Sequence, residues 1–278
     1  MGIRGLFSYC KKHLKTLNIN KDLNIGIDTS SILYRFKGNF EMIYDFLNPI
    51  LENKLLFVFD GKAPKYKEKE IELRTEARHE YEKKIELLKE SLNKDLNEET
   101  KNIIKERIKE LELESWTLTF EVIQNFKNFL KSKNLRYVKS NSEADLLLID
   151  LYHHKIIDVV LSNDMDYLTA GIKKMYINYY GELMELNLNE ILDDEDINVE
   201  QFKDIAVLSR IIQDIDLAFK YVRHYGSVYI MINNYNKFQN INYSDDILKI
   251  KERYTSSNKY DVYLKIEHKY ILDEFMGR

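Results

Sequence analysis

The chain of 278 residues is long enough for one large domain or two small ones, and its composition excludes several classes of protein. With 44% apolar and 32% charged residues, 9 Gly and 2 Pro, it is neither disordered nor collagen-like. The net charge of −4 requires that any contact with a polyanion use a local basic face. The single cysteine, Cys10, excludes a disulfide framework and a thiolate-rich zinc site. Because no apolar run is long enough to span a membrane and no signal-peptide core is present, we expect a soluble intracellular protein.

In chain order, short apolar runs alternate with helical patterns. The runs predict strands at 23–27, 55–59, 135–139 and 157–161, and the segments between them predict helices at 31–50, 119–132 and 143–153. This alternation is typical of the α/β class, with a mostly parallel twisted sheet and helices on both faces. We next expect a strand at 174–178 paired with one at 182–186, and then helices at 199–213, 217–223, 246–254 and 260–274. The chain therefore divides into a core over 1–190 and a helical C-terminal region over 191–278.

Residues 62–114 interrupt the alternation of strands and helices. They hold 14 Lys/Arg and 15 Asp/Glu, with too few apolar residues for a buried helix. The sequence SLNKDLNE at 91–98 is the only plausible break, so we predict two long helices joined by a turn. Taken alone, this pattern is most simply a solvated helical hairpin stabilised by i,i+4 ion pairs.

Acidic residues follow the carboxyl ends of four predicted strands: Asp28, then Asp60, then Glu143 with Asp145, and finally Asp164 with Asp166. In an open parallel sheet these ends meet at the edge where ligands bind, so we expect the six carboxylates to converge. An acid after a strand is also a common helix N-cap, which is enough to explain any one of them. Two of the sites, however, carry an acid–x–acid pair, whereas a helix needs only one cap.

Six carboxylates in one cleft repel one another unless a cation neutralises them. Oxygen ligands without Cys or His select hard cations, Mg²⁺ or Mn²⁺, over zinc. Two such ions held roughly 4 Å apart are a common arrangement for phosphodiester cleavage, in which one activates water and the other stabilises the leaving oxygen. The acidic residues therefore favour a two-metal nuclease or phosphatase.

Five motifs of the chain resemble, in order and register, those of the flap endonuclease family, which includes the xeroderma-group-G (XPG) nucleases and related 5′→3′ exonucleases: MGIRGLF, IGIDTSSILYRF, FVFDGKAPKYK, SEADLLL and SNDMDYL. The resemblance covers residues 1–186. It implies a PIN-like nuclease core, with residues 62–114 as a helical arch through which a single-stranded 5′ end passes. The implied activity is structure-specific DNA cleavage at 5′ flaps or 5′ ends during replication, repair or recombination. A compact, divergent member would act in the cytoplasm or nucleus, or at the replication site of a virus if the chain is virus-encoded.

The resemblance also implies roles for individual residues. A first metal ion would be held by Asp28, Asp60, Glu143 and Asp145, and a second by Asp164 and Asp166. Lys67 and Arg74 would be catalytic residues that face the scissile phosphate and stabilise its developing charge.

Three further residues would contact nucleic acid. Gly2 would lie close to DNA at the N-terminus, Tyr34 would stack on a base near the cut site, and Arg78 would bind phosphates. For Tyr34 the alternative is packing in the core. For Arg78 it is a surface ion pair with Glu82.

The chain departs from the family pattern in three places. The segment 35–55 is short and offers neither an apolar wedge nor a 3′-flap pocket. The family's Leu-Gly-x-Asp-Tyr stretch, whose Asp is a seventh metal ligand, and the glycine-rich helix–two-turn–helix after it are replaced by QFKDIAVLSRIIQDIDLAFKYVRHYGSV. Ile212 aligns with that ligand, and Asp214 is the nearest candidate, with an ordinary surface aspartate as the alternative. No clamp-binding peptide is visible near the C-terminal EFMGR, so docking on a sliding clamp is not supported.

We therefore expect a monomer that acts on DNA with a 5′ single-stranded flap, a nick or a recessed 5′ end. A 5′→3′ exoribonuclease is an alternative that the compact length and the FDGKAP-to-arginine spacing disfavour. A catalytically inactive nucleic-acid-binding scaffold is another, disfavoured because all six acids remain. An unrelated phosphatase is disfavoured because a small substrate needs no arch.

Overall fold

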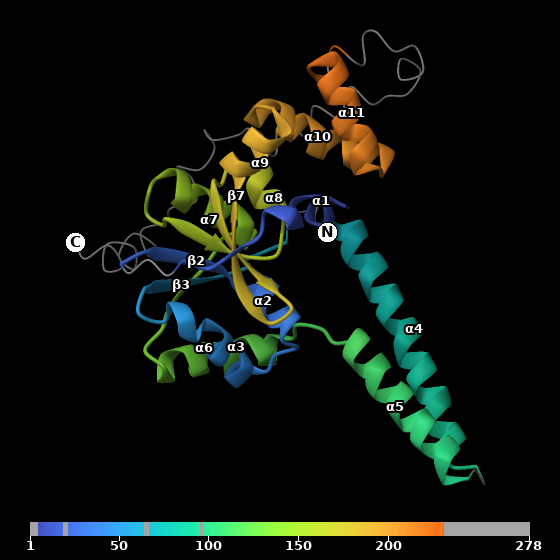
Figure 1. The fold of residues 1–278 in the computed structure, drawn as a ribbon. Helices are drawn as coiled ribbons and strands as arrows, with labels where there is room; N and C mark the ends of the chain where they lie inside the picture. Colours follow the sequence, from blue (N-terminus) through green and yellow to red (C-terminus); the bar gives the residue numbers. More distant parts are fainter. Residues whose placement is uncertain (1–4, 19–21, 64–66, 95–96, 229, 231–278) are drawn as a thin grey trace.

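The computed structural model describes residues 5–18, 22–63, 67–94, 97–228 and 230. At its centre is a seven-stranded sheet of order β1-β7-β6-β5-β2-β3-β4 (Figure 1). The strands are β1 (Lys15–Thr16), β2 (Asn24–Asp28), β3 (Lys54–Phe59), β4 (Arg136–Lys139), β5 (Val159–Leu161), β6 (Lys174–Tyr179) and β7 (Glu182–Asn187). Five of them, β6, β5, β2, β3 and β4, run parallel, while β7 is antiparallel to both β6 and β1. The predicted mostly parallel sheet and its final hairpin are confirmed.

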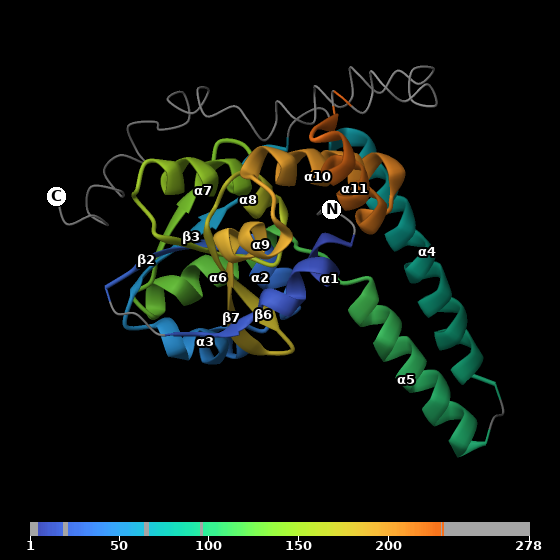
Figure 2. The same cartoon turned by 45° about the horizontal axis from the view of Figure 1, so that its top comes forward.

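Helices cover both faces of the sheet, with a hydrophobic core under each face (Figure 2). One core packs α2 (Thr29–Arg35), α3 (Phe40–Leu47) and α6 (Phe120–Ser132) against the sheet. The other packs α1 (Leu6–Cys10), α7 (Ala144–His153), α8 (Asp166–Thr169), α9 (Leu188–Glu195), α10 (Val199–Ile212) and α11 (Ile215–Tyr225). Short 3₁₀ turns lie at Lys11–His13 and Asn48–Ile50. Because both faces are covered, β3 and β5 are continuous apolar runs rather than alternating ones.

The helix predicted over 31–50 is two helices, α2 and α3. The chain turns between them at Lys37 and Gly38, which both have positive φ, of 50° and 71°. A Cβ on Gly38 would lie 3.0 Å from the Trp116 ring, so this position favours glycine on both conformational and steric grounds. The helices predicted at 246–254 and 260–274 lie outside the described residues.

The charged segment forms a helical hairpin of α4 (Glu68–Leu92) and α5 (Glu98–Glu114), as predicted. It projects from the body of the molecule (Figure 1) and has a small core of its own, built on Ile85, Ile108 and Leu111. An ion pair between Lys89 and Glu112 joins the two helices at 2.8 Å. The hairpin is thus held together along its length while most of its surface is solvated. None of the helices in the described ranges combines the length and the apolarity needed to cross a membrane.

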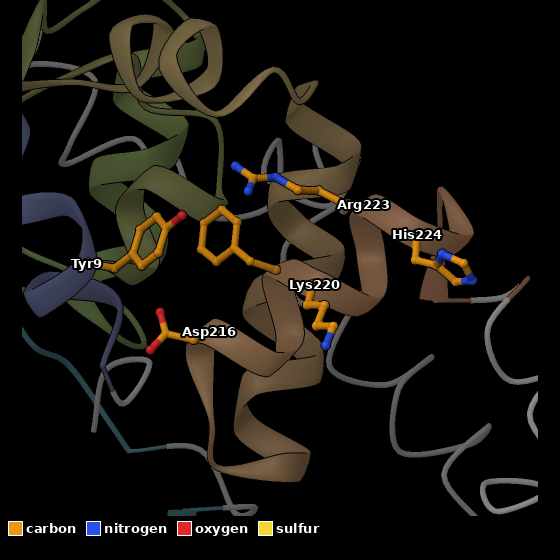
Figure 3. A pocket seen from close by; sticks show the side chains of 6 residues that line it. Tyr9, Asp216, Lys220, Arg223 and His224 are labelled. Carbon is orange, nitrogen blue, oxygen red and sulfur yellow. The ribbon is translucent and has the colours of Figure 1, made fainter.

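Helix α11 is anchored on the N-terminal helix α1. The Tyr9 ring stacks on the Phe219 ring with 4.0 Å between their centroids, and Figure 3 shows Tyr9 facing α11 beside Arg223. Glu195, the last residue of α9 and 5% exposed, accepts hydrogen bonds from the Tyr9 hydroxyl and the Lys12 ammonium, each at 2.7 Å, and pairs with Arg223. Helices α9, α10 and α11 contribute to the same hydrophobic core as α7. The division of the chain near residue 190 stays a prediction.

We expect Glu195→Gln to destabilise the protein by about 2 kcal/mol at pH 7, because it leaves Lys12 and Arg223 beside a neutral group. Burial acts to raise the pKa of Glu195, but the hydrogen bonds from Lys12 and Tyr9, together with the charges of Lys12 and Arg223, hold that pKa below its ordinary value. This stabilisation is therefore present above the unfolded-state pKa and is lost as pH falls through the folded-state pKa.

Urea unfolding at pH 7 and pH 3 measures this stabilisation. The control is Asp194→Asn, whose side chain is 56% exposed. Equal losses for the two variants at pH 7 would contradict this role of Glu195.

Candidate active site

The six predicted carboxylates gather at the carboxyl edge of the sheet. They follow β2, β3, β4 and β5, which are neighbours in the order β5-β2-β3-β4 and run parallel. Their proximity shows in their electrostatics, because the charges of Asp60 and Asp145 add to the effect of burial in raising the pKa of Asp28. The charge of Asp145 also raises the pKa of Asp164, after burial and the charge of Asp166. The convergence expected from the strand order is present in the structure.

Asp60 is fixed by the loop that leads into α7. Its Oδ1 accepts a hydrogen bond from the Ala144 N–H at 2.8 Å, so a residue after β3 caps a helix that follows β4. Two segments of the backbone approach closely here, because a Cβ on Gly61 would lie 2.1 Å from the Ser140 carbonyl oxygen. Only glycine fits at position 61, and this close approach brings Asp60 next to Glu143. Glu143 is formally the N-cap residue of α7, yet its side chain makes no capping hydrogen bond.

Asp28 accepts three hydrogen bonds from the groups around it. Its Oδ1 accepts from the Ser31 N–H at 3.0 Å, which makes it the N-cap of α2. Its Oδ2 accepts from the Ser162 hydroxyl at 3.1 Å and from the Tyr167 hydroxyl at 3.2 Å. Burial, reinforced by neighbouring acids, raises its pKa to about 7 despite these hydrogen bonds. Asp28 is therefore both the N-cap of α2 and one of the converging carboxylates. Tyr167 is a supporting residue that the sequence analysis missed, although it lies in the SNDMDYL motif.

Two cations lie against the acidic residues. Lys67, at the start of α4, forms an ion pair with Glu143. Arg210, in the last turn of α10, donates from Nη2 to Oδ2 of Asp166 at 2.6 Å. Lys67 was expected near the site, whereas Arg210 was not. Its signal was an arginine among apolar residues in VLSRII.

The donor atoms fit a hard divalent cation. All six side chains offer oxygen, and Oδ1 of Asp166 is buried without a hydrogen-bond partner in the part of the chain that the structure describes. The six carboxylates lie farther apart than the ligands of a closed coordination shell would. Among the described residues, only His13, Asp194 and Glu195 bring three ligand atoms within 4.8 Å of one another. Lys12 and Arg223 already neutralise that second group, which therefore serves as a structural ion-pair cluster.

A groove of about 610 Å³ lies at the base of the helical hairpin, where α4 and α5 meet α2. It is lined by Tyr34, Arg74, Arg78 and Trp116, among others. Tyr34 is 43% exposed and meets the Trp116 ring edge-on, with 5.4 Å between centroids, so it is not a core residue. The structure therefore brings three of the predicted substrate-contacting residues to one groove. Trp116, the only tryptophan of the chain, was missed because it lies in a loop without a motif.

The other predicted site residues have different surroundings. Arg78 forms the ion pair with Glu82, at 3.5 Å, that was its alternative role, while also lining the groove. Asp214 is exposed and caps α11, accepting from the Leu217 N–H at 2.9 Å. The α10 side chain that reaches the carboxylates is Arg210 rather than an acid. Gly2 lies outside the described residues.

Comparison with known proteins agrees with this architecture. Residues 134–211 match the model of the XPG I-region. The chain is 30% identical over 190 residues to flap endonuclease 1 of Methanobrevibacter smithii, covering 66% of this chain and 52% of that protein. It is 27% identical over 223 residues to flap endonuclease 1 of Methanocaldococcus jannaschii, covering 72% and 65%. The chain spans about half the length of most of the curated relatives it matches.

Solved structures show the same fold. The catalytic core of Rad2 in complex with a DNA substrate superposes with a TM-score of 0.59 at 14% identity, over 99% of this chain and 86% of that one. Flap endonuclease-1 from Methanococcus jannaschii gives 0.53 at 19% identity, over 96% of both chains. The fold and the acidic edge define a PIN-like nuclease-type α/β protein with a helical arch. The chain is similar to the flap endonuclease/XPG family in its XPG I-region, in its curated relatives and in its fold.

The raised pKa values predict an unusual pH dependence of stability in the metal-free protein. Asp28 and Asp164, with folded pKa values of about 7 and about 6, stay protonated in the folded state at pH values where the unfolded chain has lost those protons. These two groups therefore lower the free energy of unfolding as pH rises from about 4 to 7. In chelator at pH 8, we expect Asp28→Asn to be more stable than the wild type by about 1–3 kcal/mol.

Urea unfolding at pH 5 and pH 8 measures this effect, with the exposed Asp216→Asn as control. The gain from Asp28→Asn should shrink at pH 5. If Asp28→Asn is less stable than the wild type at pH 8, the ionised Asp28 carboxylate is favourably solvated in the folded protein and the prediction is wrong.

Proposed function

We propose that the protein is a divalent-metal-dependent nuclease that cleaves DNA at 5′ flaps or other 5′ ends. The observation that carries the proposal is the convergence of six carboxylates at the sheet edge, beside the base of the helical arch. The names of the relatives support the same activity. An arch beside the site favours a polynucleotide over a small phosphate ester, because only a strand extends far enough to use both.

The donor atoms support Mg²⁺ or Mn²⁺ as the cofactor, with up to two ions per site. Asp28, Asp60, Glu143 and Asp145 would hold the first ion, and Asp164 with Asp166 the second. When bound, such ions activate water and stabilise the leaving oxygen. Asp60 and Asp28 are held for this task by hydrogen bonds from Ala144 and Ser31. Asp214, which caps α11, is left out of the proposed ligand set.

The residues of the arch would act on the substrate strand. Lys67 is within reach of the carboxylates, since it pairs with Glu143, and its ammonium would stabilise charge on the scissile phosphate. Arg74 lies about two turns farther along α4 and lines the groove, where its guanidinium would bind the same strand.

The groove itself suits a single-stranded base. Tyr34 and Trp116 offer aromatic surface that any base can stack on, and Arg78 offers a cation for the adjoining phosphate. Together with the short 35–55 segment, this supports recognition of the 5′ strand rather than of a 3′ flap. The proposed substrates are therefore DNA with a 5′ flap, a nick or a recessed 5′ end.

The function is tested with end-labelled 5′-flap DNA, nicked duplex, single-stranded DNA and single-stranded RNA, each in Mg²⁺, Mn²⁺ or chelator. We expect cleavage of the DNA substrates with 5′ ends and none in chelator. Cleavage of RNA alone would favour an exoribonuclease, and binding without any cleavage would favour a scaffold.

We expect Asp60→Asn to lower the single-turnover rate on 5′-flap DNA at least about 10²-fold, because it removes a ligand charge while keeping the acceptor for Ala144. Affinity for the same DNA in chelator should change less than about threefold, since the loss of one acid only reduces repulsion. Quenched-flow rates and fluorescence anisotropy measure the two quantities. Asp45→Asn, an exposed acid on α3, is the control. A wild-type rate for Asp60→Asn would exclude this site.

Trp116 gives a direct signal for the groove, because it is the only tryptophan. A 5′-flap DNA added in chelator should quench its emission, whereas a blunt duplex should quench it less. Trp116→Leu should weaken flap binding about tenfold, the order expected for the loss of one stacked base. Phe120→Leu is the matched control, because it alters a 77% exposed aromatic side chain four residues along the chain that does not line the groove. Equal quenching by flap and blunt DNA would place the strand elsewhere.

A further inference from the structure

Arg210 is a permanent cation inside the acidic site. Its Nη2 lies 2.6 Å from Oδ2 of Asp166, and the two side chains are 22% and 13% exposed. Arginine keeps its charge at every physiological pH, and a partly buried, charge-assisted hydrogen bond of this length is among the stronger ones. The contact therefore gives one of the six carboxylates a counter-charge from the chain itself.

The position of Arg210 is fixed by helix packing. It lies in the last turn of α10, and α10 packs against α8, the short helix that begins at Asp166 (Figure 1). Ala206 and Ser209 on the same helix are fully buried, so the helix cannot rotate to withdraw the guanidinium without exposing core. Two residues on, position 212 is isoleucine, so α10 supplies a positive charge and no acid to this side of the site.

The contact uses donors that a second cation would need. Oδ2 of Asp166 binds the guanidinium, and Oδ1 of Asp164 accepts the Asp166 N–H at 3.0 Å. The pair is left with Oδ1 of Asp166, which has no hydrogen-bond partner among the described residues, and Oδ2 of Asp164. In the other group, Lys67 pairs with Glu143, but Asp28 and Asp60 accept hydrogen bonds from uncharged donors.

We propose that Arg210 is the built-in counter-cation of the Asp164–Asp166 pair and competes with a second divalent ion for Asp166. The inference rests on the metal-dependent function proposed above. Its consequence is that the two ions bind unequally: one is held tightly by the acids after β2, β3 and β4, and the other binds weakly because it must displace the guanidinium.

The test counts Mn²⁺ ions on the full chain without DNA, using electron paramagnetic resonance to measure unbound Mn²⁺. For the wild type we expect one tight ion and a second with a dissociation constant at least about tenfold higher. Arg210→Met, which removes the charge but keeps the length, should tighten the second ion at least about tenfold. Arg210→Lys keeps the charge and should leave the second ion weak.

Two further variants make the result specific. Lys203→Met removes a positive charge from the same helix and should change neither ion. Arg210→Gln is a second neutral variant that replaces Arg210→Met if circular dichroism shows that the latter is not folded. Two ions of equal affinity in the wild type, or an unchanged second ion in the neutral variants, would overturn the proposal for Arg210.

The outcome also separates this inference from the proposed function. A wild type that cleaves DNA while binding two equal ions refutes only the role of Arg210. A wild type whose second ion depends on Arg210 but which cleaves no nucleic acid refutes only the nuclease activity. A chain that binds no Mn²⁺ refutes both.

Discussion

The repulsion among six carboxylates at one edge of the sheet is the constraint on which the rest of the structure depends. Four parallel strands end at this edge, and each is followed by one or two acids. The fold offsets the repulsion with hydrogen bonds from Ser31, Ser162 and Tyr167 to Asp28, and with ion pairs from Lys67 and Arg210. Burial, with a smaller contribution from the neighbouring acids, still raises the pKa of Asp28 to about 7. The free protein therefore keeps part of the cost of placing these carboxylates together.

The helical arch is linked to this edge through the residues at its base. Its own small core holds α4 and α5 together at a distance from the sheet, so the hairpin projects into solvent as one unit (Figure 2). Lys67 joins the start of α4 to Glu143, and the groove lined by Tyr34 and Trp116 lies where the hairpin returns to the body. The base of the hairpin thus contacts the acidic edge through Lys67 and borders the groove through Arg74 and Arg78.

The helices after β7 are where this chain differs most from the family pattern. They lack the glycines expected there, yet they pack on the same core as α7 and are tied to α1 through Glu195 and the Tyr9–Phe219 stack. Their contribution to the site is a cation rather than an acid. A change in this region thus alters the charge balance of the acidic edge while leaving the sheet intact.

The sequence by itself determined six of the seven strands, the hairpin and the placement of the six acids; the two-residue strand β1 was not predicted. Apolar runs such as LLFVF are buried on both faces, and the motifs place each acid at a strand end, so local pattern and strand order were enough. The break at Lys37 and Gly38 was missed because the helical periodicity continues across it, while positive φ and the nearby Trp116 ring decide the turn.

Only the tertiary structure decided which side chains share the site. Asp60 caps a helix that begins 84 residues later, Trp116 meets Tyr34 across the base of the arch, and Arg210 reaches Asp166 from α10. The local sequence does not identify the partner in any of these contacts, because each joins segments far apart in the chain whose approach depends on how the elements pack. Asp214 caps α11, and its role as a metal ligand stays a prediction.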